Sequence, residues 1–268
     1  ALAAASALLA CEGRPRPEGK PEEAAPRRGP AVAVLDLSAG VPELEPASLF
    51  GPVGRRKSFD ELLRAIDDVQ KDTRAPAALV RFGGVNLGPA RAQEIGDRLA
   101  ALAEKKKVYC HADAFSNTTM MAAARGCSSI WLAPAGGVET IGLAAQIVYM
   151  RRLLADELHL SIDMLQVGKF KGADEPLTRD GPSPEARASL TGVLVGMRSA
   201  WLEGLAARKG PNMAELAEDG PYTPARAKEL GLVDEVGYVD EALAAAKSAT
   251  EAVREELVFG SGAEERPD

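Results

Sequence analysis

The residues best suited to chemistry lie in the segment 166–187, which reads QVGKFKGADEPLTRDGPSPEAR. This segment places Lys171 just after an apolar, strand-like run at 161–167 (SIDMLQV). A lysine buried at the end of a strand is desolvated, which favours a neutral amine that can accept a proton. Such a lysine can replace histidine as the general base that activates a serine nucleophile. A solvated lysine in a surface loop is the alternative, which the segment alone leaves open.

A second chemical feature is the pair Gly83 and Gly84, which follows an apolar run ending at Phe82. Glycine lets backbone N–H groups point at a developing oxyanion with no side chain in the way. We therefore expect Gly83 and Gly84 to form an oxyanion hole, with an ordinary turn as the alternative.

The lysine segment resembles that of the signal peptide peptidase A family, also called protease IV. In that family an aromatic residue, a lysine and a small residue precede an acidic residue and a proline, and a helix then begins near a Ser-Pro pair. The corresponding residues here are Phe170, Lys171, Gly172, Glu175, Pro176, Ser183 and Pro184. The resemblance covers about residues 31–246 and is closest to the amino-terminal half of the long, two-domain form.

This resemblance implies roles for three residues. Lys171 would be the general base. The stretch 137–142 (GVETIG) is similar to the family's Thr-Gly-Ser-Ile-Gly loop, so the hydroxyl of Thr140 would steady the lysine amine. Thr118 stands at the position of the family nucleophile, with Ser116 also in range. The competing interpretation is that residues 116–118 cap a helix.

The nucleophile is also where the chain departs from the family pattern. Active members carry Ser-Gly-Gly at the start of a helix, whereas this chain reads AFSNTTMMAAARG and has no glycine beside Thr118. In the long form the amino-terminal domain supplies the lysine and the carboxy-terminal domain the serine. The resemblance therefore implies that the serine comes from a second domain or chain.

Short apolar runs alternate with helical patterns from residue 31 onward, which predicts an α/β fold with a parallel sheet. We expect strands at 32–37, 77–82, 107–112, 129–133 and 161–167. We expect helices at 59–71, capped by Ser58 and Glu61, at 89–105, and then at 184–209, 223–230 and 239–250, with a brief strand or turn at 231–236. The resemblance implies the particular version, a ClpP/crotonase-like spiral of ββα units with a helical carboxy-terminal part; periodicity alone does not separate it from a Rossmann-like sheet.

The ends of the chain differ from its middle. Residues 1–11 (ALAAASALLAC) resemble the end of a secretory signal with a lipobox, so Cys11 would be lipidated. Residues 12–30 contain five prolines and predict a disordered linker. We therefore expect a peptidase domain at 31–250 and a polar tail or linker at 251–268. Lipidation would tether the domain to a membrane of the cell envelope, facing the periplasm.

Composition excludes several classes. The net charge of −7 and the lack of a basic cluster disfavour a nucleic-acid partner. His111 and His159 each adjoin an apolar run and are expected in the core or at its boundary. Without an HExxH or CxxC pattern we expect no metal site, and the proposed chemistry needs no cofactor. Cys110 and Cys127 are expected as buried free thiols, with a disulfide between them as the alternative.

The resemblance implies a serine–lysine endopeptidase that degrades signal peptides or other short hydrophobic peptides at the membrane. Its partners would be the peptide, the membrane, and either further copies of the chain or a serine-bearing domain. The predicted geometry places Lys171 in a cleft near Thr140 and Gly84. A catalytically inactive member that acts as a scaffold or peptide-binding subunit is the main alternative. An acyl-CoA enzyme of the crotonase type would leave the lysine motif unexplained.

Overall fold

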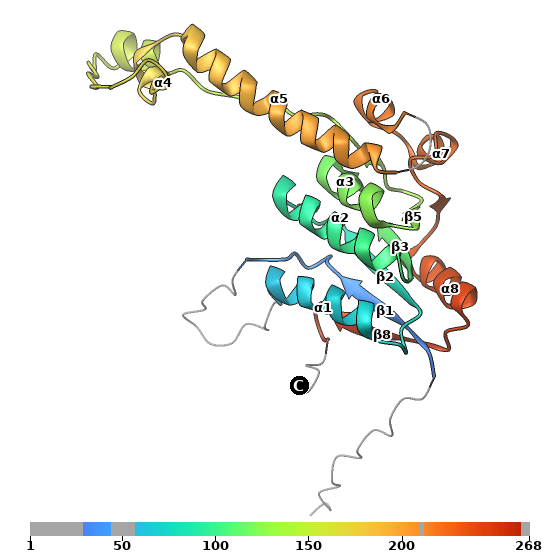
Figure 1. Ribbon diagram of the computed structural model, residues 1–268. Coiled ribbons are helices and arrows are strands. Elements are labelled where there is room, and N and C mark those ends of the chain that lie inside the picture. The colour runs from blue at the N-terminus through green and yellow to red at the C-terminus, as the bar shows by residue number, and fades with distance from the viewer. Residues whose placement is uncertain (1–28, 44–56, 209–211, 264–268) are drawn as a thin grey trace, which may run out of the picture.

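A parallel sheet forms the centre of the protein, seen in a computed structural model that describes residues 29–43, 57–208 and 212–263 (Figure 1). This six-stranded sheet has the order β7-β5-β3-β2-β1-β8, and a smaller parallel sheet pairs β4 with β6. The strands are β1 Ala31–Asp36, β2 Ala77–Gly83, β3 Lys107–Ala112, β4 Phe115–Ser116, β5 Ser129–Leu132, β6 Val138–Glu139, β7 Glu235–Val236 and β8 Arg254–Phe259. The predicted strands at 32–37, 77–82, 107–112 and 129–133 are confirmed.

Helices cover both faces of the large sheet. On one face lie α1 Phe59–Lys71, α2 Pro89–Ala103 and α3 Asn117–Gly126, and on the other lies α8 Val239–Thr250 (Figure 1). In β2, Ala78 and Val80 belong to the main core, whereas Ala77 and Leu79 pack in the smaller cluster with residues of α8. Burial on both faces explains why these strands read as continuous apolar runs rather than alternating ones.

The start of α1 confirms the predicted capping box. The backbone N–H of Ser58 donates to the Glu61 carboxylate at 2.6 Å, and the backbone N–H of Glu61 donates to Ser58 Oγ at 3.3 Å. These two bonds satisfy amides that the first helical turn leaves without a partner.

A unit of two β-strands and a helix lies near the middle of the chain, and its two-strand step is repeated after it. β3, β4 and α3 follow one another, and β5 and β6 repeat the two-strand step. The second strands of the two steps pair in parallel, with Phe115 opposite Val138 and Ser116 opposite Glu139. This is the ββα arrangement expected for a ClpP/crotonase-like fold. The helical carboxy-terminal part is also confirmed, with α5 Pro184–Ala206, α6 Met213–Glu218 and α7 Pro224–Glu229.

A long projection, which we call the arm (residues 143–200), extends away from the sheets. It contains the π-helical turn η1 Leu153–Glu157, α4 Glu175–Thr178 and most of α5, and Figure 1 shows α4 at the end of α5 that is remote from the sheet. Along α5 only Trp201, Gly204 and Leu205 are buried. Large apolar side chains of the arm are exposed: Ile147, Val148, Met150, Leu153, Leu158, Leu160, Ile162, Met164, Leu165, Val167, Phe170, Val193, Val195 and Met197.

The strand predicted at 161–167 is wrong. The segment is irregular, and Leu165 and Val167 are 100% and 93% exposed. A strand needs a neighbouring edge for its backbone hydrogen bonds, and the arm presents no such edge to this segment. The apolar residues that suggested a buried strand are therefore left without a core beneath them in the single chain.

The described ranges contain no helix with both the length and the apolar character required to cross a membrane. Cys11, the predicted signal segment at 1–11 and residues 12–28 of the linker predicted at 12–30 lie outside the described residues.

Part of the polar tail or linker predicted at 251–268 is a strand, β8. β8 pairs in parallel with β1 and forms the edge of the large sheet. Its polar residues Glu255 and Glu256 concealed it in the sequence, because an edge strand tolerates charged side chains. Phe259 at its end is buried in the main core.

Truncating Phe259 should therefore destabilise the domain. Phe259→Ala is expected to lower the free energy of unfolding by about 3–5 kcal/mol, because it removes a buried aromatic ring. Val253→Ala, at a side chain that is 70% exposed, should change it by less than about 0.5 kcal/mol. Urea unfolding followed by circular dichroism measures both; equal effects would show that β8 is not an integral strand.

Cys110 and Cys127 are joined in a disulfide, so the prediction of free thiols is wrong and its alternative holds. Cys110 lies in β3 and Cys127 caps the end of α3, with Cα atoms 5.9 Å apart. The two cysteines meet because the end of α3 returns to β3, where the backbone N–H of Ser128 donates to the carbonyl of Val108 at 2.8 Å. The bond ties the sheet to the helix that carries Ser116 and Thr118 near its start.

Reduction of this disulfide should lower the free energy of unfolding by about 3 kcal/mol, from the entropy of the loop that it closes. Urea titrations with and without a thiol reductant measure the change. The Cys110→Ala/Cys127→Ala double variant should match the reduced protein and no longer respond to the reductant. An unchanged midpoint on reduction of the wild type would show that the bond does not stabilise this fold.

Candidate functional site

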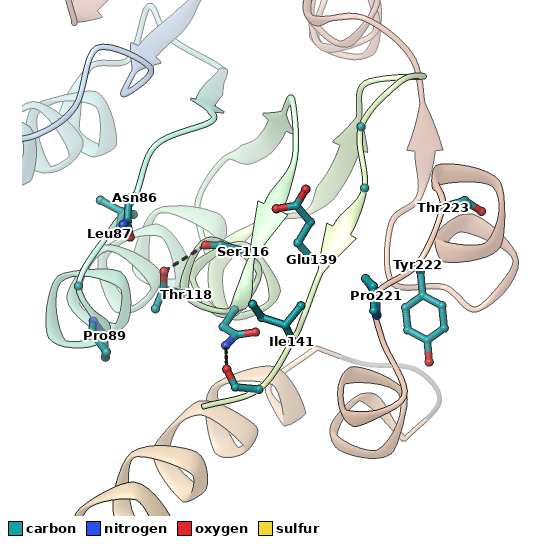
Figure 2. Close-up of a pocket in the computed structure, with 15 residues that line it drawn as sticks. Asn86, Leu87, Pro89, Ser116, Thr118, Glu139, Ile141, Pro221, Tyr222 and Thr223 are labelled. Carbon is teal, nitrogen blue, oxygen red and sulfur yellow. Dashed lines mark hydrogen bonds between the residues drawn. The ribbon is translucent and has the colours of Figure 1, made fainter. Parts of the chain in front are cut away.

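A cleft of about 830 Å³ opens between the loop before α2, the start of α3, β6 and the loop before α7 (Figure 2). The start of α3 contributes Ser116, Asn117 and Thr118, in the region expected for the family nucleophile. The lining residues are Asn86, Leu87, Gly88, Pro89, Ser116, Asn117, Thr118, Gly136, Gly137, Glu139, Ile141, Gly142, Pro221, Tyr222 and Thr223.

Ser116 caps α3, as the competing interpretation predicted. Its Oγ accepts a hydrogen bond from the backbone N–H of Thr119 at 3.3 Å, and the Thr119 hydroxyl accepts one from the backbone N–H of Ser116 at 2.8 Å. The Thr118 hydroxyl lies 3.2 Å from Ser116 Oγ (Figure 2). The two hydroxyls are therefore hydrogen-bonded to each other, and the nucleophile role of Thr118 stays a prediction.

Asn117 is a cleft residue that the sequence did not single out. Its side-chain N–H donates to the backbone carbonyl of Gly142 at 2.5 Å, and the backbone carbonyl of Asn117 accepts a hydrogen bond from Trp201 Nε1 at 2.9 Å. Its Oδ1 is buried without a hydrogen-bond partner among the described residues. Asn117 thus joins α3, the loop after β6 and the end of α5.

Gly83 and Gly84 do not line this cleft, so the oxyanion hole predicted for them is not formed beside Ser116 and Thr118. Gly83 ends β2 at a φ of +58°, and a Cβ there would lie 2.6 Å from the Cβ of Ser38. Its carbonyl accepts from the backbone N–H of Asp113 at 3.0 Å. Glycine is required here by the strand exit, in line with the ordinary-turn alternative.

Thr140 is buried, and its hydroxyl has no hydrogen-bond partner among the described residues. It lines a second, smaller hollow of about 390 Å³ with Trp201 and Arg198 of α5. Gly220 packs so closely that a Cβ on it would lie 2.2 Å from the Thr140 oxygen. Thr140 therefore has an unused hydroxyl, as a lysine-supporting group would need, but Lys171 is not beside it.

Lys171 is exposed near the remote end of the arm, so the expectation that it lines a cleft near Thr140 and Gly84 is wrong for the single chain. The residue that follows it, Gly172, packs against Glu175, which in turn accepts from the backbone N–H of Ser183 at the start of α5. α5 lies next to the cleft at Trp201, whose Nε1 donates to the backbone carbonyl of the cleft residue Asn117. At 1.5 Å per residue, Ser183 and Trp201 are about 27 Å apart along the helix.

The loop that carries Lys171 is held by Glu175. This carboxylate is buried and accepts hydrogen bonds from the Ser183 hydroxyl and from the Ser183 backbone N–H, the latter at 2.8 Å, and both bonds lower its pKa. A Cβ on Gly172 would lie 2.5 Å from its Oε1. Gly172, Glu175 and Ser183, which the sequence grouped as one motif, therefore meet in space and fix the base of the loop.

The two histidines differ in their surroundings. His111 is buried in β3, where burial lowers its pKa and Nε2 lies 3.1 Å from the carbonyl oxygen of Gly237. The prediction of a core histidine is confirmed for His111. It is wrong for His159, which is exposed in the arm at a φ of +52°. Among the described residues, no group of three or more His, Cys, Asp or Glu is placed to hold a metal ion.

The fold and the cleft define the class as an α/β protein with a parallel sheet, ββα units and a lysine-bearing arm. A family model described as peptidase family S49 matches residues 100–253, more than half of the chain, so the chain belongs to peptidase family S49. The match includes the start of α3, the lysine segment and all of α5.

Curated relatives agree with this assignment. Protease 4 of Salmonella typhi is 43% identical over 60 residues, covering 22% of this chain and 10% of the relative. The chloroplastic serine protease SPPA of Arabidopsis thaliana is 24% identical over 120 residues, covering 44% and 18%. The chain thus spans less than a fifth of the length of these two relatives. An enoyl-CoA hydratase from Shewanella pealeana aligns with 72% of this chain and 62% of its own at a TM-score of 0.37 and 10% identity, a likeness too distant to bear on function.

The low pKa of Glu175 gives a pH prediction. A carboxylate whose pKa is lowered in the folded protein stabilises it above the unfolded value near 4.5, and this contribution is lost as pH falls through the lower folded value. The amide signal of Ser183 should therefore shift in nuclear magnetic resonance spectra with a midpoint below 4.5. Glu175→Gln should abolish this titration, whereas Glu185→Gln, a half-buried residue in the first turn of α5, should leave it unchanged. A midpoint at or above 4.5 would contradict the proposed hydrogen bonds.

Proposed function

We propose that this chain is the lysine-bearing unit of a serine–lysine endopeptidase of the signal peptide peptidase A type. The observation that carries the proposal is the placement of Lys171, which is exposed in the arm beyond the start of α5, whereas the chain's own cleft lies near Trp201, about 27 Å further along that helix. A base at that distance cannot serve a hydroxyl in the same cleft, because proton transfer needs contact within about 3 Å. The nucleophile that it serves would belong to another domain or chain.

The exposed apolar surface of the arm supports such a partner. Apolar patches of this kind mark protein–protein contacts, and here they occupy the same segment as Lys171. We propose that the arm docks on a second copy or on a serine-bearing domain. Docking would bury Val167 and Phe170 and would remove water from the amine of the neighbouring Lys171.

In the docked state the neutral amine would act as general base. It would take the proton of the partner's serine hydroxyl as the oxygen attacks the peptide carbonyl carbon, and would return that proton to the leaving amine. The substrates we propose are signal peptides and other short hydrophobic peptides. Lipidation at Cys11 would place this activity on a membrane of the cell envelope, on its periplasmic side.

A non-catalytic role is the second candidate, favoured by the chemistry of the chain's own cleft. The hydroxyls of Ser116 and Thr118 bond to each other, and Ser116 and Thr119 cap α3. Neither hydroxyl has a basic side chain in the cleft lining to activate it. The cleft would then bind peptides without cleaving them.

The test compares Lys171 with Lys169, which lies two positions earlier in the sequence. With the chain joined to its serine-bearing domain, Lys171→Met is expected to lower kcat for a hydrophobic peptide by at least about a thousandfold, because the general base is lost. The matched control is Lys169→Met, which should retain activity within a few-fold. In the wild type the Lys169 amine lies 5.4 Å from the centre of the Phe170 ring.

The isolated 268-residue chain is expected to hydrolyse the same peptide poorly, with no further loss in Thr118→Ala. Ready cleavage by the isolated chain that Thr118→Ala abolishes would overturn the proposal and make Thr118 the nucleophile. Equal activity of Lys171→Met and wild type in the joined form would leave the non-catalytic role.

A further inference from the structure

Glu139 is the one charged residue among the described residues that line the cleft. It ends β6, opposite Ser116 of β4, and in Figure 2 its side chain stands between the Ser116 side of the cleft and the Pro221–Thr223 side. The strand geometry explains this direction: Val138 points into the core and is fully buried, so the next residue points to the opposite face and is exposed.

The carboxylate of Glu139 is uncommitted. Among the described residues, no hydrogen bond and no ion pair engages its oxygens. Many arginines of the domain are instead paired with other carboxylates. Its backbone is fixed on both sides, because β6 pairs with β4 and Val138 bridges to Tyr222. A fixed strand thus presents a free negative charge to the cleft.

The rest of the lining is neutral and in large part apolar, including Leu87, Pro89, Ile141 and Pro221. Ile141 is 79% exposed, two residues from Glu139. A ligand that complements this surface carries an apolar segment for these side chains and one positive charge for the carboxylate. A lysine or arginine within an apolar peptide meets both requirements.

We infer that the cleft selects peptides that carry a lysine or arginine beside apolar residues, and that Glu139 determines this preference. The inference rests on the proposed function, in that the ligand is a peptide. Secretory signal peptides combine a positively charged region with an apolar one, which fits the proposed substrate class. An exposed ion pair of this kind changes affinity by about two- to fivefold.

The experiment uses two fluorescein-labelled alanine–leucine peptides that differ at one central position, lysine in one and norleucine in the other. Fluorescence anisotropy gives Kd for each with the full chain, with Glu139→Gln and with Glu203→Gln, which removes one exposed carboxylate on α5 outside the cleft. Circular dichroism and thermal unfolding confirm that both variants fold as the wild type does.

The expected result is a Kd about two- to fivefold lower for the lysine peptide with the wild type and with Glu203→Gln, and equal Kd values with Glu139→Gln. In 1 M salt the difference should vanish, because the screening length falls to about 3 Å.

Equal Kd values with the wild type would overturn the inference while leaving peptide recognition by the cleft in place. A lysine preference that survives in Glu139→Gln would overturn it as well, since another group would then recognise the charge. Failure of both peptides to bind would overturn peptide recognition by this chain, and the inference with it. Failure of the Lys171 experiment with intact binding here would leave a peptide-binding subunit.

Discussion

The contact between Trp201 and the start of α3 is the constraint on which the arrangement of both functional parts depends. Trp201 Nε1 donates to the carbonyl of Asn117 at 2.9 Å, one of the few polar bonds between α5 and the core. One turn later, Gly204 packs on Met121 so closely that a Cβ would lie 2.4 Å from the Met121 Cγ. These contacts bury the last turns of α5 and leave the rest of the helix to project outward (Figure 1).

The same contact shapes the cleft, because Asn117 also bonds to Gly142 in the loop after β6. The cleft is thus built where α5 ends, and the lysine loop is built where α5 begins. A rigid helix between them holds the two at a fixed separation in the chain. Under the proposed function, the unit would offer its lysine to a neighbour while its own cleft remains available to a ligand.

The sequence predicted the elements that carry their own signal. Continuous apolar runs located β1, β2, β3 and β5, and the Ser58–Glu61 capping box located α1, because these patterns depend on local geometry and burial on both faces. The run 161–167 gave the same signal and failed, since its apolar side chains are not covered within this chain. The sequence analysis missed the strand β8, because the charged residues of an edge strand resemble those of a polar tail.

The site followed the same division. The catalytic roles of Lys171 and Thr118 stay predictions, but the closed base of the lysine loop and the cleft region of Ser116 and Thr118 were indicated by motif. Asn117 and Glu139 were not, because their importance comes from which loops meet at the cleft, and that is decided by tertiary packing. Predicting the Cys110–Cys127 bond likewise required knowing that the end of α3 lies beside β3. Gly83 and Gly84 suggested an oxyanion hole, but the structure explains Gly83 by the backbone geometry at the end of β2.

The pairing of β1 with β8 has a consequence for biosynthesis. β1 takes one of its two partners from residues 254–259, more than two hundred positions later in the chain. Until those residues are synthesised, β1 has an open edge on one side, a surface on which nascent chains pair wrongly with each other. Contacts of such long sequence separation also slow folding. The large sheet can therefore be completed only near the end of translation of this region. A chaperone that shields the edge of β1 until then would raise the yield of folded protein.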